Sequence, residues 1–370
     1  MLKQKRLWFV LLTPISLIII FLVRKNSWIA EYVLAQGVYK FLAQLISNIT
    51  GLIPFSLMEL SLYIIVILFI VLLVYIVKLL FFKREGIRKK FLNILINISC
   101  TFSILLFLFT IFAGANYYRY PFSEINHINT EESSVEDLYK LNMYLLDQAS
   151  DLRKDLELKQ VYVNEKGIIE INNISWVQLT NSVEEAYMNL SKHYPVLDGS
   201  YGRAKPVLYS KFMSRMEVTG IFWPFSLEAN INIHAPDYTI PTTIAHEMAH
   251  QRGFMREDEA NYIAYLACIH SDDLLLQYSG TMLALSHAGN ALYKEDLELY
   301  YETRSFFHEG MNADLRYKAG YWSQFNDTVI STVSTKMNDT YLKANNQKDG
   351  VKSYGRMVDL LLAGLKAEYL

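Results

Sequence analysis

Three long apolar stretches in the first third of the sequence constrain the fold more than any other feature. Each approaches or exceeds the ~20 residues that an α-helix needs to cross ~30 Å of hydrocarbon. The first is long for the apolar part of a signal peptide and has no convincing small-residue cleavage site after it, so we expect it to be retained. Glu59 stands near the start of the second, where its carboxylate can reach the lipid headgroups. We therefore predict three membrane-spanning helices, at residues 7–23, 55–77 and 91–113.

Basic residues predict the orientation of these helices, because the lysines and arginines of short loops stay in the cytoplasm. Lys3, Lys5 and Arg6 precede the first stretch, and residues 78–90 carry six basic residues within thirteen. With three spans and a cytoplasmic N-terminus, the remainder of the chain lies outside. We expect a multi-pass protein of a bacterial cell membrane, with a membrane domain at 1–117 and an extracytoplasmic domain at 118–370.

The segment 28–50, between the first two spans, is partly amphipathic and is expected to lie along the outer membrane surface. The outer domain has about 250 residues, which is enough for one substantial core. Cys100 lies in the third span and Cys268 lies outside, so we expect no disulfide between them. The net charge is -2 and there is no basic stripe, so the sequence does not predict nucleic-acid binding.

Hydrophobic periodicity predicts an α+β outer domain that is mostly helical and contains a small sheet. Short β-branched and aromatic stretches bounded by turn residues indicate strands within 205–213 and 220–234. Apolar positions elsewhere recur at helical spacing. The expected helices cover 134–158, 175–192, 240–252, 256–271, 272–290, 294–306, 311–337 and the C-terminal 350–370.

Residues 243–261, TIAHEMAHQRGFMREDEAN, carry the chemistry of the chain. His246 and His250 are four residues apart, so on a helix they lie on one face and can share one zinc ion. Glu247 is one step round the helix and can reach a water activated by the metal, as in the H-E-x-x-H arrangement. The alternative is a pair of structural histidines, but this leaves Glu247 among apolar neighbours without a partner, at high cost.

A third zinc ligand is expected just after the motif. Gly253 is placed to end the helix in a left-handed C-cap, and the chain then reverses into a second helix. Glu257 is followed four residues later by Asn261, which can hydrogen-bond a ligand histidine from the same face. Glu259 is followed at that spacing by Ile263, which offers nothing. Glu257 is therefore the favoured ligand, and Glu259 is the reserve.

The stretch GIFWPFSLEANINIH, at 220–234, comes just before the expected metal helix. A sheet edge beside a zinc helix can bind an extended peptide by strand addition, which holds a carbonyl near the metal. The alternative is a strand that only packs Phe222, Trp223 and Phe225 into the core.

The segment TTIAHEMAHQRGFMREDEANYIAYLAC resembles the signature of a bacterial membrane family, domain of unknown function 3810 (DUF3810). The stretches TGIFWPFSLEANIN and NDTYLKANNQKDGVKSYGRMVDLLL resemble it too, so the likeness covers most of the chain. This resemblance implies a zinc-peptidase-like, zincin-like outer domain.

The motif also resembles gluzincin peptidases, especially the membrane group in which H-E-x-x-H is followed by E-x-E-A-D and the first glutamate of the second motif is a ligand. Asn261 stands where that group has aspartate, and the interval from His250 to Glu257 is much shorter. The matching positions are His246, Glu247, His250, Glu257, Glu259, Ala260 and Asn261.

These features predict a membrane-anchored zinc metallopeptidase that cleaves a peptide or protein outside the cytoplasm, with Zn²⁺ as cofactor and Glu247 as general base. The alternatives are a catalytically silent sensor or binding module and a zinc hydrolase of a non-peptide amide of the cell envelope. A zinc peptidase usually adds a side-chain donor for the oxyanion. The unranked candidates are Tyr341, Tyr354, Arg356 and His308.

Overall fold

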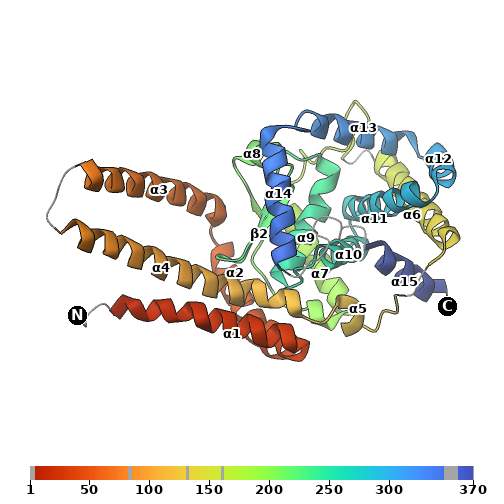
Figure 1. Cartoon of the computed structure of the whole chain (residues 1–370). Helices are drawn as coiled ribbons and strands as arrows, with labels where there is room; N and C mark the ends of the chain where they lie inside the picture. Colours follow the sequence, from red (N-terminus) through yellow and green to blue (C-terminus); the bar gives the residue numbers. More distant parts are fainter. Residues whose placement is uncertain (1–4, 82–85, 131–132, 160–161, 346–356, 370) are drawn as a thin grey trace.

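The protein is described by a computed structural model that covers residues 5–81, 86–130, 133–159, 162–345 and 357–369. Three helices long and apolar enough to cross a membrane extend from one side of a mostly helical body (Figure 1). They cover Lys5–Lys25, Leu57–Leu79 and Ile87–Phe112, in agreement with the three predicted spans. The corresponding elements are η1 (Lys5–Leu11) with α1 (Leu12–Lys25), α3 (Leu57–Phe81) and α4 (Ile87–Phe112).

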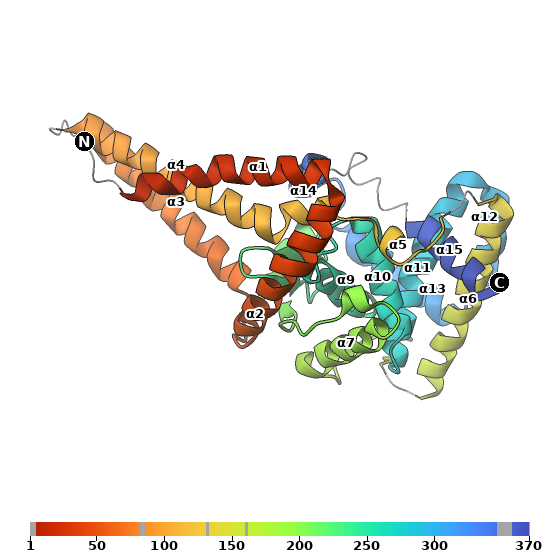
Figure 2. The same cartoon turned by 90° about the horizontal axis from the view of Figure 1, so that it is seen from below.

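The first and third spans pack along each other, whereas the second stands apart. Arg6 donates hydrogen bonds to the side chains of Asn93 and Asn97, and Thr13 donates to Ser103 at 2.8 Å. The most apolar stretch of α3 buries no residue. The start of η1, the end of α3 and the start of α4 therefore lie at the same end of the bundle, away from the helical body (Figures 1 and 2).

The segment between the first two spans forms two helices that pack on the helical body. They are η2 (Ile29–Tyr39, a π-helix) and α2 (Lys40–Gly51). Figure 2 shows them running across the direction of α1, between the spans and the body. Their inner face buries small and polar residues, while the other face exposes large apolar side chains. These exposed residues are Trp28, Tyr32, Val33, Val38, Phe41, Leu45, Ile49 and Leu52.

Contacts of this segment cross the expected boundary at residue 118. Glu31 and Arg119 form a buried ion pair at 2.8 Å, and the Tyr39 hydroxyl donates to the carbonyl oxygens of His250 and Gln251 at 3.1 and 3.0 Å. The Lys205 ammonium donates to three carbonyl oxygens of the stretch 50–55. A buried charge needs such partners. Buried polar groups on each side of residue 118 therefore obtain hydrogen bonds or ion pairs from the other side.

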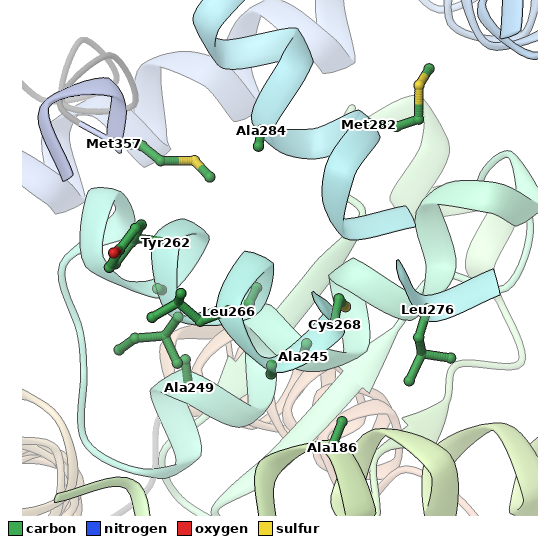
Figure 3. Close-up of a cluster of buried hydrophobic side chains, with 14 of the residues drawn as sticks. Ala186, Ala245, Ala249, Tyr262, Leu266, Cys268, Leu276, Met282, Ala284 and Met357 are labelled. Carbon is green, nitrogen blue, oxygen red and sulfur yellow. The ribbon is translucent and has the colours of Figure 1, made fainter. Parts of the chain in front are cut away.

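The helical body has one large core, to which α6, α7, α9, α10, α11 and α15 contribute. Ala245 and Ala249 lie on one face of α9, and Figure 3 shows them beside Ala186 of α7 and side chains of α10 and α11. Such small residues let helices approach closely. Capping boxes at Ser134 and Ser175 begin α6 and α7. The α-helices of the body are α5 (Phe122–Ile125), α6 (Val135–Leu158), α7 (Trp176–Ser191), α8 (Ser210–Arg215), α9 (Ile240–Gln251), α10 (Glu257–Ile269), α11 (Leu274–Glu295), α12 (Leu297–Ser305), α13 (Glu309–Ser323), α14 (Val329–Ala344) and α15 (Met357–Tyr369).

Three short strands form the small sheet, in the order β1-β3-β2. β1 (Lys205–Pro206) is parallel to β3 (Glu228–Ile231), and β2 (Gly220–Trp223) is antiparallel to it. Pro224 lies in the turn after β2, where its missing N–H costs no ladder hydrogen bond. Among the described residues β2 pairs only with β3, so no strand covers its other edge. Short 3-10 helices join these elements: η3 (Gly114–Tyr118), η4 (Pro195–Leu197) and η5 (Asp237–Thr239).

Two predicted elements differ from the observed ones. The strand expected within 205–213 stops at Pro206, and the chain turns into α8 at Ser210, whose hydroxyl accepts from the backbone of Ile233. The single helix expected at 311–337 is interrupted between α13 and α14, where Asp327 has φ 56°. Aspartate tolerates this left-handed conformation better than most residues, but it ends a right-handed helix.

Candidate metal centre

Helices α9 and α10 form a hairpin that brings the two parts of the motif together. Pro241 stands in the first turn of α9, where its missing N–H is harmless. Gly253 ends the turn after α9 with φ 87°, so the predicted left-handed C-cap is confirmed. A side chain at this position would also approach Tyr39 and Arg119 to 3.0 Å. The chain therefore reverses tightly, and Glu257 begins α10 close to His250.

Two imidazoles and one carboxylate converge at this hairpin. Nε2 of His246 lies 3.1 Å from Oε2 of Glu257, and Nε2 of His250 lies 3.8 Å from Oε1 of the same carboxylate. One ligand atom from each of the three residues lies within 4.8 Å of the others. Two imidazole nitrogens and a carboxylate oxygen are ligands that catalytic zinc sites use, with one position left for water. The three residues could therefore hold a metal ion.

The remaining ring nitrogens of both histidines are occupied by hydrogen bonds. Nδ1 of His246 lies 2.9 Å from Oδ1 of Asn261, and Nδ1 of His250 lies 2.7 Å from the carbonyl oxygen of Phe254. An acceptor at Nδ1 fixes the tautomer that leaves Nε2 free to ligate. Both imidazoles are thus oriented as metal ligands normally are. The partner of His250 is a backbone group, which no side-chain pattern could have predicted.

We expect Asn261→Ala to weaken zinc binding by about 10- to 100-fold, because loss of an outer hydrogen-bond partner typically costs this much affinity. Affinity is measured on the full chain by competition with a chromogenic chelator. Asn189→Ala is the matched control, since its amide donates to the carbonyl oxygen of His270 at 3.4 Å and accepts from Lys192 at 2.9 Å, both outside the site. Equal zinc affinity of Asn261→Ala and the unmodified protein would contradict the assigned role of Asn261.

Glu259, the reserve ligand, has a different environment. Its Oε1 accepts hydrogen bonds from the backbone N–H of Phe122 and from Arg256, both at 2.9 Å. Arg256 also donates to the carbonyl oxygen of Arg119. Glu259 thereby joins α10 to the chain that leaves the third span, and it is not part of the converging group of metal-ligating atoms.

The Glu247 carboxylate is buried between α9 and the edge strand β2. Among the described residues, its Oε2 has no hydrogen-bond partner. A Cβ at Gly220 would lie only 2.5 Å from Oε1, so glycine at this position of β2 makes room for the carboxylate. Burial raises the pKa of Glu247 to about 8. The charge of His246 and the Phe222 backbone offset only part of this shift. A buried carboxylate with an unpaired oxygen is costly for stability, which is typical of a functional group.

The three candidate ligands perturb one another. Burial opposes a charge on Glu257, but the two histidines hold its pKa below the usual value. Burial likewise opposes protonation of His246, but Glu257 raises its pKa to about 9. Burial lowers the pKa of His250 to about 4. Without a cation, a proton on His246 thus balances the Glu257 carboxylate, and a bound metal ion would supply that positive charge instead.

Of the four candidate oxyanion donors, Tyr341 lies near the site. Its hydroxyl is 3.1 Å from that of Tyr117, and its ring packs edge-on against Phe109 of α4. Burial raises the pKa of Tyr341, and the charge of Glu257 adds to this shift. Tyr341 belongs to α14, which continues to Ala344.

His308 takes another role, since its side chain caps the start of α13 and lies 3.9 Å from Glu157. Neither contact involves the converging residues. Tyr354 and Arg356 lie outside the described residues.

Aromatic groups around the site were not predicted. Tyr117 follows the third span and touches Tyr341, and the Phe222 ring lies 6.3 Å from that of His250. The sequence predicts that Phe222 belongs to a strand, but its position beside His250 depends on how the sheet packs against α9. Only the aromatic residues of 220–225, just before H-E-x-x-H, indicate in the sequence that aromatic rings could lie near the site.

A family model matches most of the chain. The class defined by the fold and the converging group is a multi-span membrane protein with a helical domain that presents a His-His-Glu cluster. The chain belongs to the family described as Protein of unknown function (DUF3810), whose model matches residues 34–362. Comparison with curated proteins and with solved structures finds no match.

Proposed function

We propose that this protein is a membrane-anchored zinc metallopeptidase. The observation that carries the proposal is the convergence of His246, His250 and Glu257, with one ligand atom of each within 4.8 Å of the others. Both Nε2 atoms lie near the Glu257 carboxylate. When bound, zinc supplies an activated water and polarises the carbonyl that is attacked. The residues of the chain must then orient the substrate and move protons.

Glu247 is the general base in this proposal. Its position one residue after a ligand directs it beside the metal position, and its Oε2 has no other partner among the described residues. It takes a proton from the attacking water and passes it to the leaving amine. Tyr341 donates its hydroxyl group to the oxyanion in this proposal. It belongs to α14, whereas the histidines belong to α9, and it lies close enough to Glu257 to sense its charge.

The edge of β2 that does not pair with β3 holds the substrate in this proposal. An extended peptide can add to this edge as a fourth strand, through backbone hydrogen bonds that do not depend on its sequence. Gly220 and Phe222 of β2 border Glu247 and His250 respectively, so a peptide on this edge lies along the reacting groups. This arrangement favours peptides over other amides.

The domain that carries the site is extracytoplasmic in this proposal. Lys78, Arg88, Lys89 and Lys90 lie at the end of the bundle where Arg6 contacts α4, and short basic loops stay in the cytoplasm. The helical body extends from the opposite end of the bundle (Figure 1).

The test uses the full chain purified in detergent. We expect about one zinc per chain by mass spectrometry, and cleavage of a randomised fluorogenic peptide library that is lost after chelation and restored by zinc. Zinc without cleavage of any peptide would favour a silent binding module. Zinc with cleavage only of a non-peptide envelope amide would replace the peptidase proposal, and a folded protein that binds no zinc would overturn it.

A further inference from the structure

The second and third spans leave a cleft between them. A cavity of about 580 Å³ lies between α3 and α4, which run apart in Figure 1. Its walls are mostly apolar, and they include Leu68 and Leu72 of α3 and Ile98 and Leu105 of α4. The cleft lies within the apolar stretches of both helices, so its contents must be compatible with the hydrocarbon layer.

Three polar residues line this cleft: Tyr75 of α3 and Asn97 and Thr101 of α4. Asn97 accepts a hydrogen bond from Arg6, whereas Tyr75 and Thr101 are exposed residues with hydroxyl groups. A lipid chain offers no hydrogen-bond partner to a hydroxyl, whereas a polar residue or a backbone carbonyl of another transmembrane helix does. The lining therefore favours one face of a transmembrane helix over a lipid tail.

The outer end of the cleft lies beneath β2. Met58, at the start of α3, packs in one cluster with Ile221 and Trp223, whereas Phe112, at the end of α4, packs in another with Phe222. Residues of β2 thus pack against the two clusters that contain the outer ends of α3 and α4. A chain that leaves the cleft at this end meets β2 first.

The candidate ligands lie at the same end. Tyr39, in the segment between the spans, bonds the carbonyl oxygens of His250 and Gln251, and Arg256, just before Glu257, bonds the carbonyl oxygen of Arg119. The exposed apolar face of η2 and α2 runs across the spans at this level, as an interfacial helix does. The site therefore lies next to the membrane surface.

We infer that the substrates are membrane-anchored polypeptides. A transmembrane helix of the substrate lies in the cleft between α3 and α4, and the stretch just outside the bilayer adds to β2 and is cleaved. This inference rests on the proposed peptidase function. It predicts that anchoring by a helix accelerates cleavage more than simple concentration of a peptide at the surface.

The test uses the full chain in vesicles of phosphatidylcholine and phosphatidylglycerol. One randomised fluorogenic peptide is supplied in three forms: free, attached to an acyl chain, and attached to a designed Leu/Ala transmembrane helix. We expect the helix-anchored form to be cleaved about tenfold faster than the acyl-anchored form at equal surface density, because the cleft adds a second binding contact.

The variant Leu72→Trp fills the cleft and should reduce cleavage of the helix-anchored form to the acyl-anchored rate, with cleavage of the free peptide unchanged. Ile70→Trp is the control, because two residues along α3 place it on the opposite, exposed face. A photo-crosslinking residue at position 72, but not at position 70, should capture the designed helix even in Glu247→Gln.

Each remaining outcome is decisive. Equal rates for the helix and acyl forms would overturn the inference and leave a general peptidase of the membrane surface. Cleavage of the free peptide faster than of the helix-anchored form would overturn the inference as well. If none of the three forms is cleaved, the peptidase proposal itself is overturned, and the inference with it.

Discussion

The Glu257→Ala variant is expected to lose zinc, whereas Glu259→Ala is expected to retain it. Glu257 supplies the carboxylate of the converging group, so its removal leaves two imidazoles, too few protein ligands for a stable catalytic zinc site. We expect zinc affinity to fall by more than the ~10- to 100-fold that loss of an outer partner costs. Mass spectrometry of the full chain, with zinc titration against a chelator, measures the change.

Glu259→Ala serves as the matched control because it removes a carboxylate only two residues away. Its side chain accepts from Phe122 and Arg256, so its loss should lower the thermal unfolding temperature and leave zinc bound. The opposite result, zinc lost with Glu259→Ala and kept with Glu257→Ala, would show that the ligand assignment is wrong.

Glu247→Gln is expected to abolish most peptide cleavage while zinc remains bound. Loss of a general base typically lowers the rate by about 10²- to 10⁴-fold. Glutamine keeps the volume and can still form hydrogen bonds, but it cannot accept the proton. The measurement is kcat on the fluorogenic library with equal zinc content in both proteins. Glu185→Gln, an exposed position on α7, controls for the change of charge.

The same substitution should not destabilise the fold. Glu247 is buried and its Oε2 has no partner among the described residues, so a neutral amide removes a desolvation cost. We expect the zinc-free variant to unfold at the same or a higher temperature than the zinc-free parent. A lower unfolding temperature, together with lost activity, would indicate that Glu247 acts mainly in packing.

Much of the site could be predicted because its geometry is local. The spacing of His246 and His250 determines a shared helix face, and Gly253 determines a sharp reversal, so Glu257 and Asn261 follow from the sequence alone. Glu259 could be ranked below Glu257 by the same reasoning. The membrane spans could also be predicted from the sequence, since length and apolarity are sufficient to identify them.

Other features depend on contacts between distant segments. Ser210 begins a helix inside an apparent strand pattern because its hydroxyl accepts from Ile233, a partner that no short window contains. The approach of Tyr341 to the site depends on the path of α14, and hydrophobic periodicity alone did not reveal the break at Asp327 that directs it. The amphipathic segment 28–50 was expected to lie along the outer membrane surface, and the sequence alone did not show that its inner face packs on α9 through Tyr39.

The docking of η2 and α2 has a consequence for how the protein is made. The carbonyl groups at the end of α9 and the ammonium of Lys205 obtain several of their hydrogen bonds from the chain between the first two spans. These hydrogen bonds form only after that chain has docked on the body. We therefore expect insertion of the first two spans and completion of this end of α9 to be coupled during folding.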